Sequence, residues 1–349
     1  AMELMGWVVS IPVFCDSGFV ILNPIRKALV NRTGVSSVAM SITLSCGLYI
    51  SHVFIPPTPG PIAAASTLGI GDNLLMVMGI GALCSIFPLI AGYFYAKYIG
   101  KKVTADDEAN CNDVKKSYEE LVAEYGKLPN GFIALAPILV PILLMGASSI
   151  ASMAGWSGTA NDILKFLGTP IIALAVGTIF GVIQLVGARR IDKFYDLTNE
   201  TLKTVGPILF VTAAGGLLGK VIASTSMIDY ITQNAELLET IGIFFPFILA
   251  AILKSAQGSS TVALTTTAGI VAPILPVLGL DSPIRATLAV MAIGAGAMTV
   301  SHANDSYFWV VTNFGAMTPE KGYKTQTMAT LVLGISGMLE IFILSLFLH

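Results

Sequence analysis

A short polar run at 301–306 (Ser-His-Ala-Asn-Asp-Ser) constrains this chain most, because it lies inside a long apolar stretch. From residue 286 to residue 317, the only acidic, basic or histidine residues are His302 and Asp305. The sequence is 54% hydrophobic and 11% charged, whereas soluble domains carry about 25% charged residues. The chain is therefore predicted to be an integral membrane protein. In a bilayer such a run is costly unless it lines a cavity or packs within protein, so it is a candidate functional site.

A second apolar stretch is interrupted in a similar way at 51–61 (Ser-His-Val-Phe-Ile-Pro-Pro-Thr-Pro-Gly-Pro). Both interruptions begin with Ser-His. The prolines of the earlier one cannot continue a helix, so an extended segment that lines a cavity is expected over 56–61. Two interrupted hydrophobic segments at corresponding places in two halves are typical of secondary transporters.

The order of the segments indicates a repeat. In the first half, an apolar stretch broken near Asp16 precedes the stretch broken at His52, and an unbroken apolar span follows. In the second half, a stretch broken near Ser259 precedes the stretch broken at His302, and again an unbroken span follows. The unbroken spans are expected at 74–95 and 326–348.

The predicted fold is an all-α polytopic membrane protein with two inverted-topology repeats. Each repeat contains a re-entrant helical hairpin and a broken transmembrane helix. Residues 1–96 form the first repeat, 97–130 a charged cytoplasmic linker, and 131–349 the second repeat with its scaffold helices. Because the chain opens inside a hydrophobic segment, the first repeat is expected to be incomplete at its N-terminus. The scaffold spans are expected at about 131–152, 169–188 and 204–223.

Loop charges predict the orientation, since loops rich in Lys and Arg lie on the cytoplasmic side. The loop Ser224–Thr240 has acidic residues and no Lys or Arg, so it is expected outside. The predicted orientation is consistent along the chain only if residues 1–22 form a hairpin that enters and leaves the membrane from the cytoplasm. Residues 241–280 must likewise form a hairpin that enters and leaves from outside. Lys254, near the tip of the second hairpin, is then expected to snorkel to the outer interface or else to pair with a carboxylate of the hairpin. The expected cytoplasmic charges are Arg26, Lys27, Arg32, the lysines of 97–127, Arg189, Arg190, Lys193, Lys203, Lys321 and Lys324.

The breaks offer groups that bind a carboxylate. A half-helix that begins at a break has free N–H groups and a positive dipole end, which suit an anion. Gly258 permits close approach of the backbone, and the hydroxyl groups that follow it add donors. Alternatively, these small residues only let helices pack closely. The predicted carboxylate-binding residues are Gly258, Ser259, Ser260 and Thr261, with Asp16, Ser17 and Gly18 at the first break; Thr58, Gln257, Asn304 and Ser306 are expected to meet substrate hydroxyls, with His52 as a further donor.

His302, Asp305 and Asp16 are the candidate proton-coupling residues. Histidine changes its charge near neutral pH, and a carboxyl group in an apolar medium takes up a proton more readily than one in water. The alternative for each of these side chains is that it caps a broken helix.

Other functional classes find little support in the sequence. No cofactor or metal site is predicted, and the absence of a basic patch on a soluble domain argues against a nucleic-acid partner. Cys15, Cys46 and Cys84 lie in apolar stretches and are expected to behave as small buried hydrophobic residues.

Four stretches together resemble the gluconate:proton symporter family (GntP-type permeases). They are 11–19 (Ile-Pro-Val-Phe-Cys-Asp-Ser-Gly-Phe), 52–61, 256–263 (Ala-Gln-Gly-Ser-Ser-Thr-Val-Ala) and 301–306. The resemblance covers essentially the whole chain. It implies uptake of gluconate or a related sugar acid with protons across a bacterial inner membrane. It also implies membership of the ion-transporter superfamily, a homodimer that moves by an elevator motion, and scaffold helices before the first hairpin that this chain lacks.

Two departures leave the substrate open. Many family members carry Phe-Glu where this chain has Cys15 and Asp16, and a histidine in place of Thr58. Some relatives carry D-serine or other small hydroxy acids, so a hydroxy amino acid permease is an alternative. A sodium-coupled carboxylate carrier, a passive channel and an intramembrane enzyme that uses Ser, His and Asp are the remaining alternatives.

Overall fold

The computed structural model describes residues 1–11, 13–106, 131–153, 156–203 and 242–348. Within these ranges every regular element is a helix, which confirms the all-α prediction. Three helical stretches are long and apolar enough to cross a membrane, namely Ser37–Thr67, Gly71–Ile99 and Pro319–Phe347. A bent helix pair at 159–187 adds a fourth if it counts as one span. The predicted scaffold span at 204–223 and most of the predicted linker lie outside the described residues.

The described chain divides into two compact units. The smaller unit holds the described residues of Asp72–Leu75 and Asn110–Pro207. Its helices include α8 (Gly131–Met153), α9 (Thr159–Gly168) and α10 (Pro170–Gly187), and α8 packs against both α9 and α10. Helices α8 and α10 match the predicted spans at 131–152 and 169–188.

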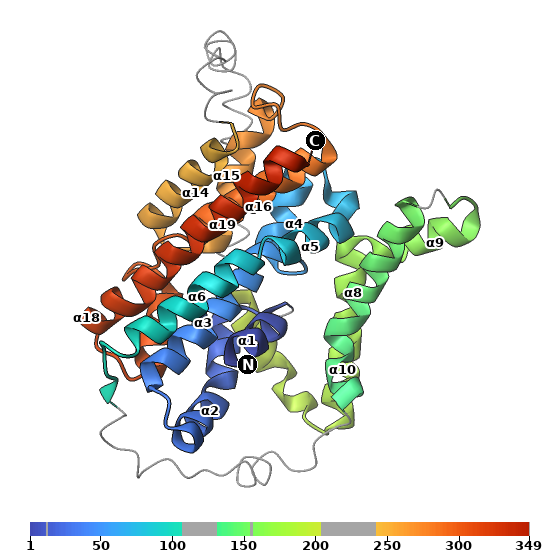
Figure 1. The fold of residues 1–349 in the computed structure, drawn as a ribbon. Helices are drawn as coiled ribbons and strands as arrows, with labels where there is room; N and C mark the ends of the chain where they lie inside the picture. The colour runs from blue at the N-terminus through green and yellow to red at the C-terminus, as the bar shows by residue number, and fades with distance from the viewer. Residues whose placement is uncertain (12, 107–130, 154–155, 204–241, 349) are drawn as a thin grey trace. The chain divides into compact units, whose positions relative to one another are not determined.

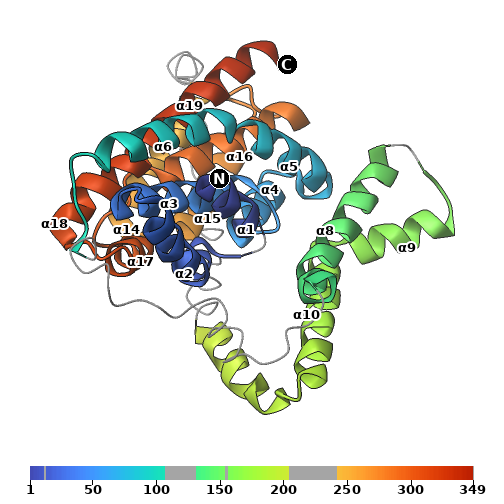
Figure 2. The same cartoon turned by 60° about the horizontal axis from the view of Figure 1, so that its bottom comes forward.

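The larger unit holds the described residues of Ala1–Gly71, Met76–Ala109 and Ile208–His349. Its main helices are α1 (Met2–Ser10), α2 (Cys15–Thr33), α3 (Ser37–Phe54), α4 (Pro59–Thr67), α5 (Leu74–Leu83, from Met76 onward), α6 (Ile86–Ile99), α14 (Phe244–Gln257), α15 (Ser260–Val271), α16 (Pro283–Met298), α17 (Ser306–Phe314), α18 (Pro319–Gly322) and α19 (Met328–Phe347). Helices α3, α6, α16 and α19 run side by side (Figures 1 and 2).

Helix α16 forms the centre of this unit, since every residue from Ala286 to Met298 is buried. Its small side chains allow the neighbouring helices to approach closely. A Cβ atom added at Gly296 would lie 2.2 Å from the backbone oxygen of Phe247 in α14. The glycine therefore fixes the distance between α16 and α14.

The polar runs interrupt the helices where the sequence predicts. Helix α3 ends at Phe54, and α4 begins at Pro59, so the prediction of an extended segment over 56–61 is too long. Proline suits the first turn of a helix because its missing N–H group would have no partner there. The non-helical segment is thus Ile55 to Thr58.

The two breaks of the second half end in capped helices. Gly258 ends α14 in the left-handed conformation with φ +90°, which glycine adopts without steric cost. The hydroxyl of Ser259 then accepts a hydrogen bond from the backbone N–H of Val262 in α15. Asp305 caps α17 in the same way, by accepting a hydrogen bond from the N–H of Tyr307.

Two further expectations differ from the structure. Arg26, Lys27 and Arg32, expected among the cytoplasmic loop charges, lie in helix α2, and Arg26 is fully buried there. Its guanidinium group donates hydrogen bonds to Asn23 (2.8 Å), to the Ser37 hydroxyl (2.7 Å) and to the Phe314 carbonyl (3.2 Å). Arg26 is buried inside the unit because this ring of acceptors replaces water.

The span expected at 74–95 lies within the apolar stretch Gly71–Ile99, which is long enough to cross a membrane, but a turn at Cys84–Ser85 divides it into α5 and α6. The buried carboxylate of Glu340 accepts a hydrogen bond of 2.9 Å from the backbone N–H of Phe87, in the first turn of α6. A side chain of α19 thus satisfies an N–H group that a helix start leaves free. The three cysteines expected to be buried are buried and free.

Candidate functional site

The four interruptions lie close together in the larger unit. Helix α15 packs on α4, α16 packs on α3 and α4, and α17 packs on α2. The start of α2, the α3–α4 break, the tip between α14 and α15, and the α16–α17 break are therefore joined through direct helix contacts. We call these four segments the break cluster.

The centre of the break cluster is a buried ion pair between Lys254 and Asp305. The Lys254 ammonium lies 2.6 Å from Oδ2 of Asp305, and the two side chains are 0% and 5% exposed. The same carboxylate accepts hydrogen bonds from the Ser301 hydroxyl and the Tyr307 N–H. The expectation that Lys254 snorkels to the interface is therefore wrong. The ammonium pairs with a carboxylate, but Asp305 belongs to the α16–α17 break and not to the hairpin.

The Lys254 ammonium has two more partners. It donates a hydrogen bond to the carbonyl oxygen of Gly258, at the hairpin tip, and it lies 5.8 Å from the centre of the Tyr49 ring. A lysine has three N–H donors, and an aromatic face attracts a cation. One charged side chain thus joins the hairpin tip to the α16–α17 break.

His302 and Asn304 hold the break against the last turn of α14. The Asn304 amide donates a hydrogen bond of 2.8 Å to the carbonyl oxygen of Ser255, and Nε2 of His302 lies 3.1 Å from the same oxygen. Asn304 is exposed and His302 half-buried. Both side chains were predicted to bind substrate or a proton, and in this structure both contact backbone.

Asp16 and Ser306 are brought together from opposite ends of the sequence. The Ser306 hydroxyl donates a hydrogen bond of 3.1 Å to Oδ1 of Asp16. Asp16 is half-buried, Ser306 and Ser17 are exposed, and Gly18 is buried. The two predicted site residues therefore form one polar contact between α2 and α17.

His52 lies in an aromatic setting. It is 3% exposed, with its ring centre 5.5 Å from that of Phe14 and 6.5 Å from that of Tyr49, which is stacked on it. Its Nδ1 atom is buried and has no hydrogen-bond partner in the described part of the chain. Thr58 is also buried, and its hydroxyl donates to the Ile55 carbonyl at 2.8 Å.

The hairpin tip is held by its own side chains. The Gln257 amide donates to the Ser259 carbonyl at 2.6 Å and accepts from the Ser259 N–H at 2.9 Å. Ser260 and Thr261 are buried at the start of α15. Gln257, predicted to meet a substrate hydroxyl, thus fixes the shape of the tip in this structure.

Sequence reasoning gave no functional role to two residues, Tyr49 beside the break cluster and Ser301 within it. Tyr49 contacts His52, Lys254 and Tyr307 through its ring, and Ser301 holds Asp305. Tyr49 precedes His52 by one helical turn, which places the two on one helix face. That spacing could have indicated Tyr49, and Ser301 begins the polar run at 301–306 that the sequence analysis singles out.

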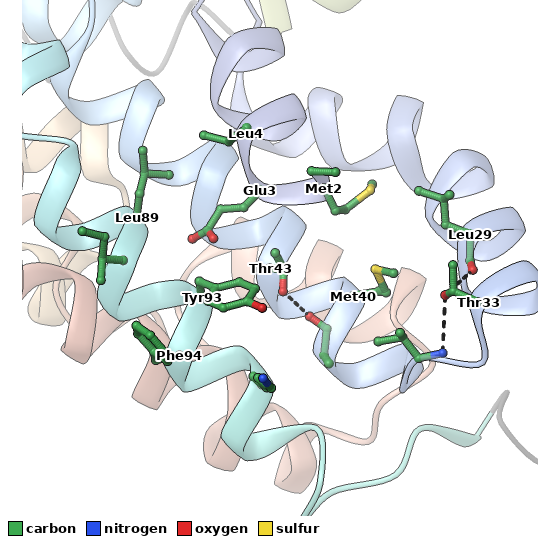
Figure 3. A pocket seen from close by; sticks show the side chains of 15 residues that line it. Met2, Glu3, Leu4, Leu29, Thr33, Met40, Thr43, Leu89, Tyr93 and Phe94 are labelled. Carbon is green, nitrogen blue, oxygen red and sulfur yellow. Dashed lines mark hydrogen bonds between the residues drawn. The ribbon is translucent and has the colours of Figure 1, made fainter.

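Two hollows lie outside the charged centre. A cavity of about 650 Å³ is bounded by α1, α2, α3 and α6, and its lining is almost wholly apolar apart from Glu3, Thr33, Thr43 and Lys97 (Figure 3). None of the predicted site residues lines it. A smaller, open hollow of about 360 Å³ beside α14 reaches Ser255 and Thr299, next to the α16–α17 break. The candidate site is therefore the break cluster.

Apolar helices with buried polar breaks at their meeting point define a multi-pass helical membrane protein whose functional groups lie inside the helix packing. Residues 1–347 match the model of the GntP family permeases, and the chain belongs to that family. The resemblance seen in the four sequence stretches is thus confirmed.

Three relatives place the chain more closely. It is 31% identical over 353 residues to the gluconate permease of Pseudomonas aeruginosa, covering 100% of this chain and 76% of that protein. It is 27% identical over 355 residues to the Gnt-II system L-idonate transporter of Escherichia coli, covering 100% of this chain and 77% of the relative. It is 29% identical over 347 residues to the E. coli inner membrane permease YgbN, covering 97% and 75% respectively.

Together these findings identify a permease, which is a transporter and not an enzyme. The apolar helices and the inner membrane relative place it among the multi-pass proteins of the bacterial inner membrane.

Proposed function

We propose that this protein carries gluconate or a related sugar acid into the cell together with protons. The observation that carries the proposal is the break cluster, in which four helix interruptions surround a buried ion pair inside a permease fold. Relatives named as gluconate and L-idonate transporters support the sugar acid class.

In this proposal the substrate carboxylate binds between the hairpin tip at Gly258–Thr261 and the start of α2 at Asp16–Gly18. Helix starts at both places offer N–H groups to an anion. The substrate hydroxyls replace the present hydrogen-bond partners of four side chains, namely Thr58, Asn304, Ser306 and Gln257. His52 donates a hydrogen bond to a substrate oxygen through Nδ1, an atom that has no hydrogen-bond partner among the described residues.

His302, Asp305 or Asp16 carries the proton in the proposed cycle. Asp305 is held by Lys254 and Asp16 by Ser306, so protonation of either carboxylate weakens a contact between elements of the break cluster. The order of breaks in the two halves supports two inverted repeats over 1–96 and 131–349, joined by a linker at 97–130. We propose that the hairpins gate the two sides, and that a homodimer moves by an elevator motion.

The test is uptake of labelled gluconate by cells that express the protein, with and without a proton gradient. Unlabelled gluconate, other sugar acids and D-serine serve as competitors. We expect gradient-dependent accumulation that sugar acids block. Accumulation blocked only by D-serine assigns the protein to hydroxy amino acids, and equilibration without accumulation overturns the proposal in favour of a passive channel.

The variants His302→Ala and Asp305→Asn test the coupling assignment. Each is expected to abolish accumulation while the protein remains inserted in the membrane, as measured by its level in isolated membranes. The matched control is Lys321→Gln, which breaks the exposed ion pair with Asp106 at 2.6 Å. Normal proton-driven uptake in both variants would remove the α16–α17 break from the coupling mechanism.

A further inference from the structure

The atoms around the Lys254 ammonium are those that bind a hard metal cation. They are a carboxylate oxygen of Asp305 and the carbonyl oxygen of Gly258, at the C-terminal end of half-helix α14. Backbone carbonyls at half-helix C-termini, together with the negative ends of helix dipoles, bind coupling cations such as sodium in broken-helix carriers. The Ser301 hydroxyl donates to the same Asp305 oxygen and holds it in place.

The Lys254 ammonium is shielded from solvent at this position. Lys254 is fully buried, and the Tyr49 ring covers a further side of the charge. An ammonium group is a compact point charge with its donors arranged around one atom, and it therefore replaces a small cation better than a planar guanidinium does.

We infer that Lys254 is a tethered cation that fills a sodium-type site between the α14–α15 tip and the α16–α17 break, so that the carrier works without sodium. The inference rests on the proposed function and deepens it, because it names the charge that holds the α14–α15 tip against the α16–α17 break. If the ammonium is removed and space is left for an ion, the same oxygens should then bind sodium.

The size of the substituted side chain separates this inference from a plain structural ion pair. Lys254→Ala removes the charge and opens room for an ion beside the Asp305 and Gly258 oxygens. Lys254→Met removes the charge but keeps a stem of similar length in the same space. A structural ion pair predicts that both variants lose stability alike, whatever the salt.

The experiment measures thermal unfolding of the purified full chain in detergent, in NaCl, KCl and choline chloride at equal ionic strength. The wild type is expected to unfold at one temperature in all three salts. Lys254→Ala is expected to unfold at a lower temperature in choline, and saturating sodium should raise its Tm by roughly 5 °C. Lys254→Met and the double variant Lys254→Ala/Asp305→Asn are expected to show no sodium effect.

Equal Tm values of Lys254→Ala in sodium and choline would overturn the inference. A wild type that sodium stabilises would also overturn it. Uptake by the wild type at fixed pH, with sodium replaced by choline, is expected to be unchanged. If the wild type carries no sugar acid at all, the proposed function fails, whereas the unfolding temperatures still decide whether Lys254 fills a cation site.

Discussion

The two Ser-His breaks begin with the same dipeptide but are held by different forces. The first break is neutral, with His52 buried between aromatic rings and Thr58 bonded to the carbonyl of Ile55. The second break is charged, with Asp305 paired to Lys254 and His302 on a backbone carbonyl. A matching motif in two halves therefore does not imply a matching role.

The difference has a physical reason. Prolines stop the helix at the first break without help from any charge, because they cannot continue it. The second break contains no proline, so its seven residues between α16 and α17 depend on side-chain bonds to keep their shape. The first break is thus fixed mainly by covalent geometry and the second mainly by electrostatics.

Removing one charge from the second break should have the largest effect on stability. Asp305→Ala leaves the Lys254 ammonium buried without its carboxylate, and such losses cost about 3–5 kcal/mol. The measurement is the free energy or temperature of unfolding in detergent. Lys321→Ala at the exposed ion pair is the control, with an expected loss of about 0–1 kcal/mol. Equal losses in the two variants would show that the second break does not depend on its charges.

The hairpin tip should be the next most sensitive position. Gly258 has φ +90°, and a Cβ there would lie 2.1 Å from the backbone oxygen of Asn304. Gly258→Ala is expected to lose more than about 2 kcal/mol, since it adds a clash to the left-handed backbone. Gly34→Ala is the matched control, because Gly34 has φ +66° with open space around it, and only the backbone cost of about 1–2 kcal/mol applies. A Gly258 variant as stable as the Gly34 variant would mean that the tip does not pack closely on the break.

The neutral break should tolerate loss of its histidine as far as folding is concerned. His52→Phe keeps a ring between Phe14 and Tyr49, so unfolding is expected to change by less than about 1 kcal/mol. Loss of one hydrogen bond to the substrate should raise the KM for gluconate about tenfold, which corresponds to about 1.4 kcal/mol. An unchanged KM would assign His52 to packing alone.

Loss of the contact that joins the two halves should change stability only slightly. Ser306→Ala removes the hydroxyl that donates to Asp16, and a single partly exposed hydrogen bond contributes about 0.5–1.5 kcal/mol. The unfolding temperature measures this loss. Asp16→Asn in the Ser306→Ala background should add little, because the shared contact is already absent. Additive losses would show that the two side chains act independently.

Much of the fold follows from the sequence alone. Apolar content and length determine a helical membrane protein, and the prolines at 56–61 and the glycine at 258 set where helices end, because both residue types act on the local backbone. The break at 258–259 lies where the sequence predicts, and the break at 299–305 overlaps the polar run at 301–306. The buried cysteines follow in the same way from their apolar surroundings.

Only the tertiary structure determined which groups the charged side chains pair with. Lys254 and Asp305 are 51 residues apart, and Arg26 reaches Phe314 across 288 residues. No local sequence pattern predicts such pairs, so Lys254 was expected at the interface and Arg26 in a loop. A buried charge is stable only where distant segments supply its partners, and the packing of α14, α16, α17 and α2 decides where that occurs.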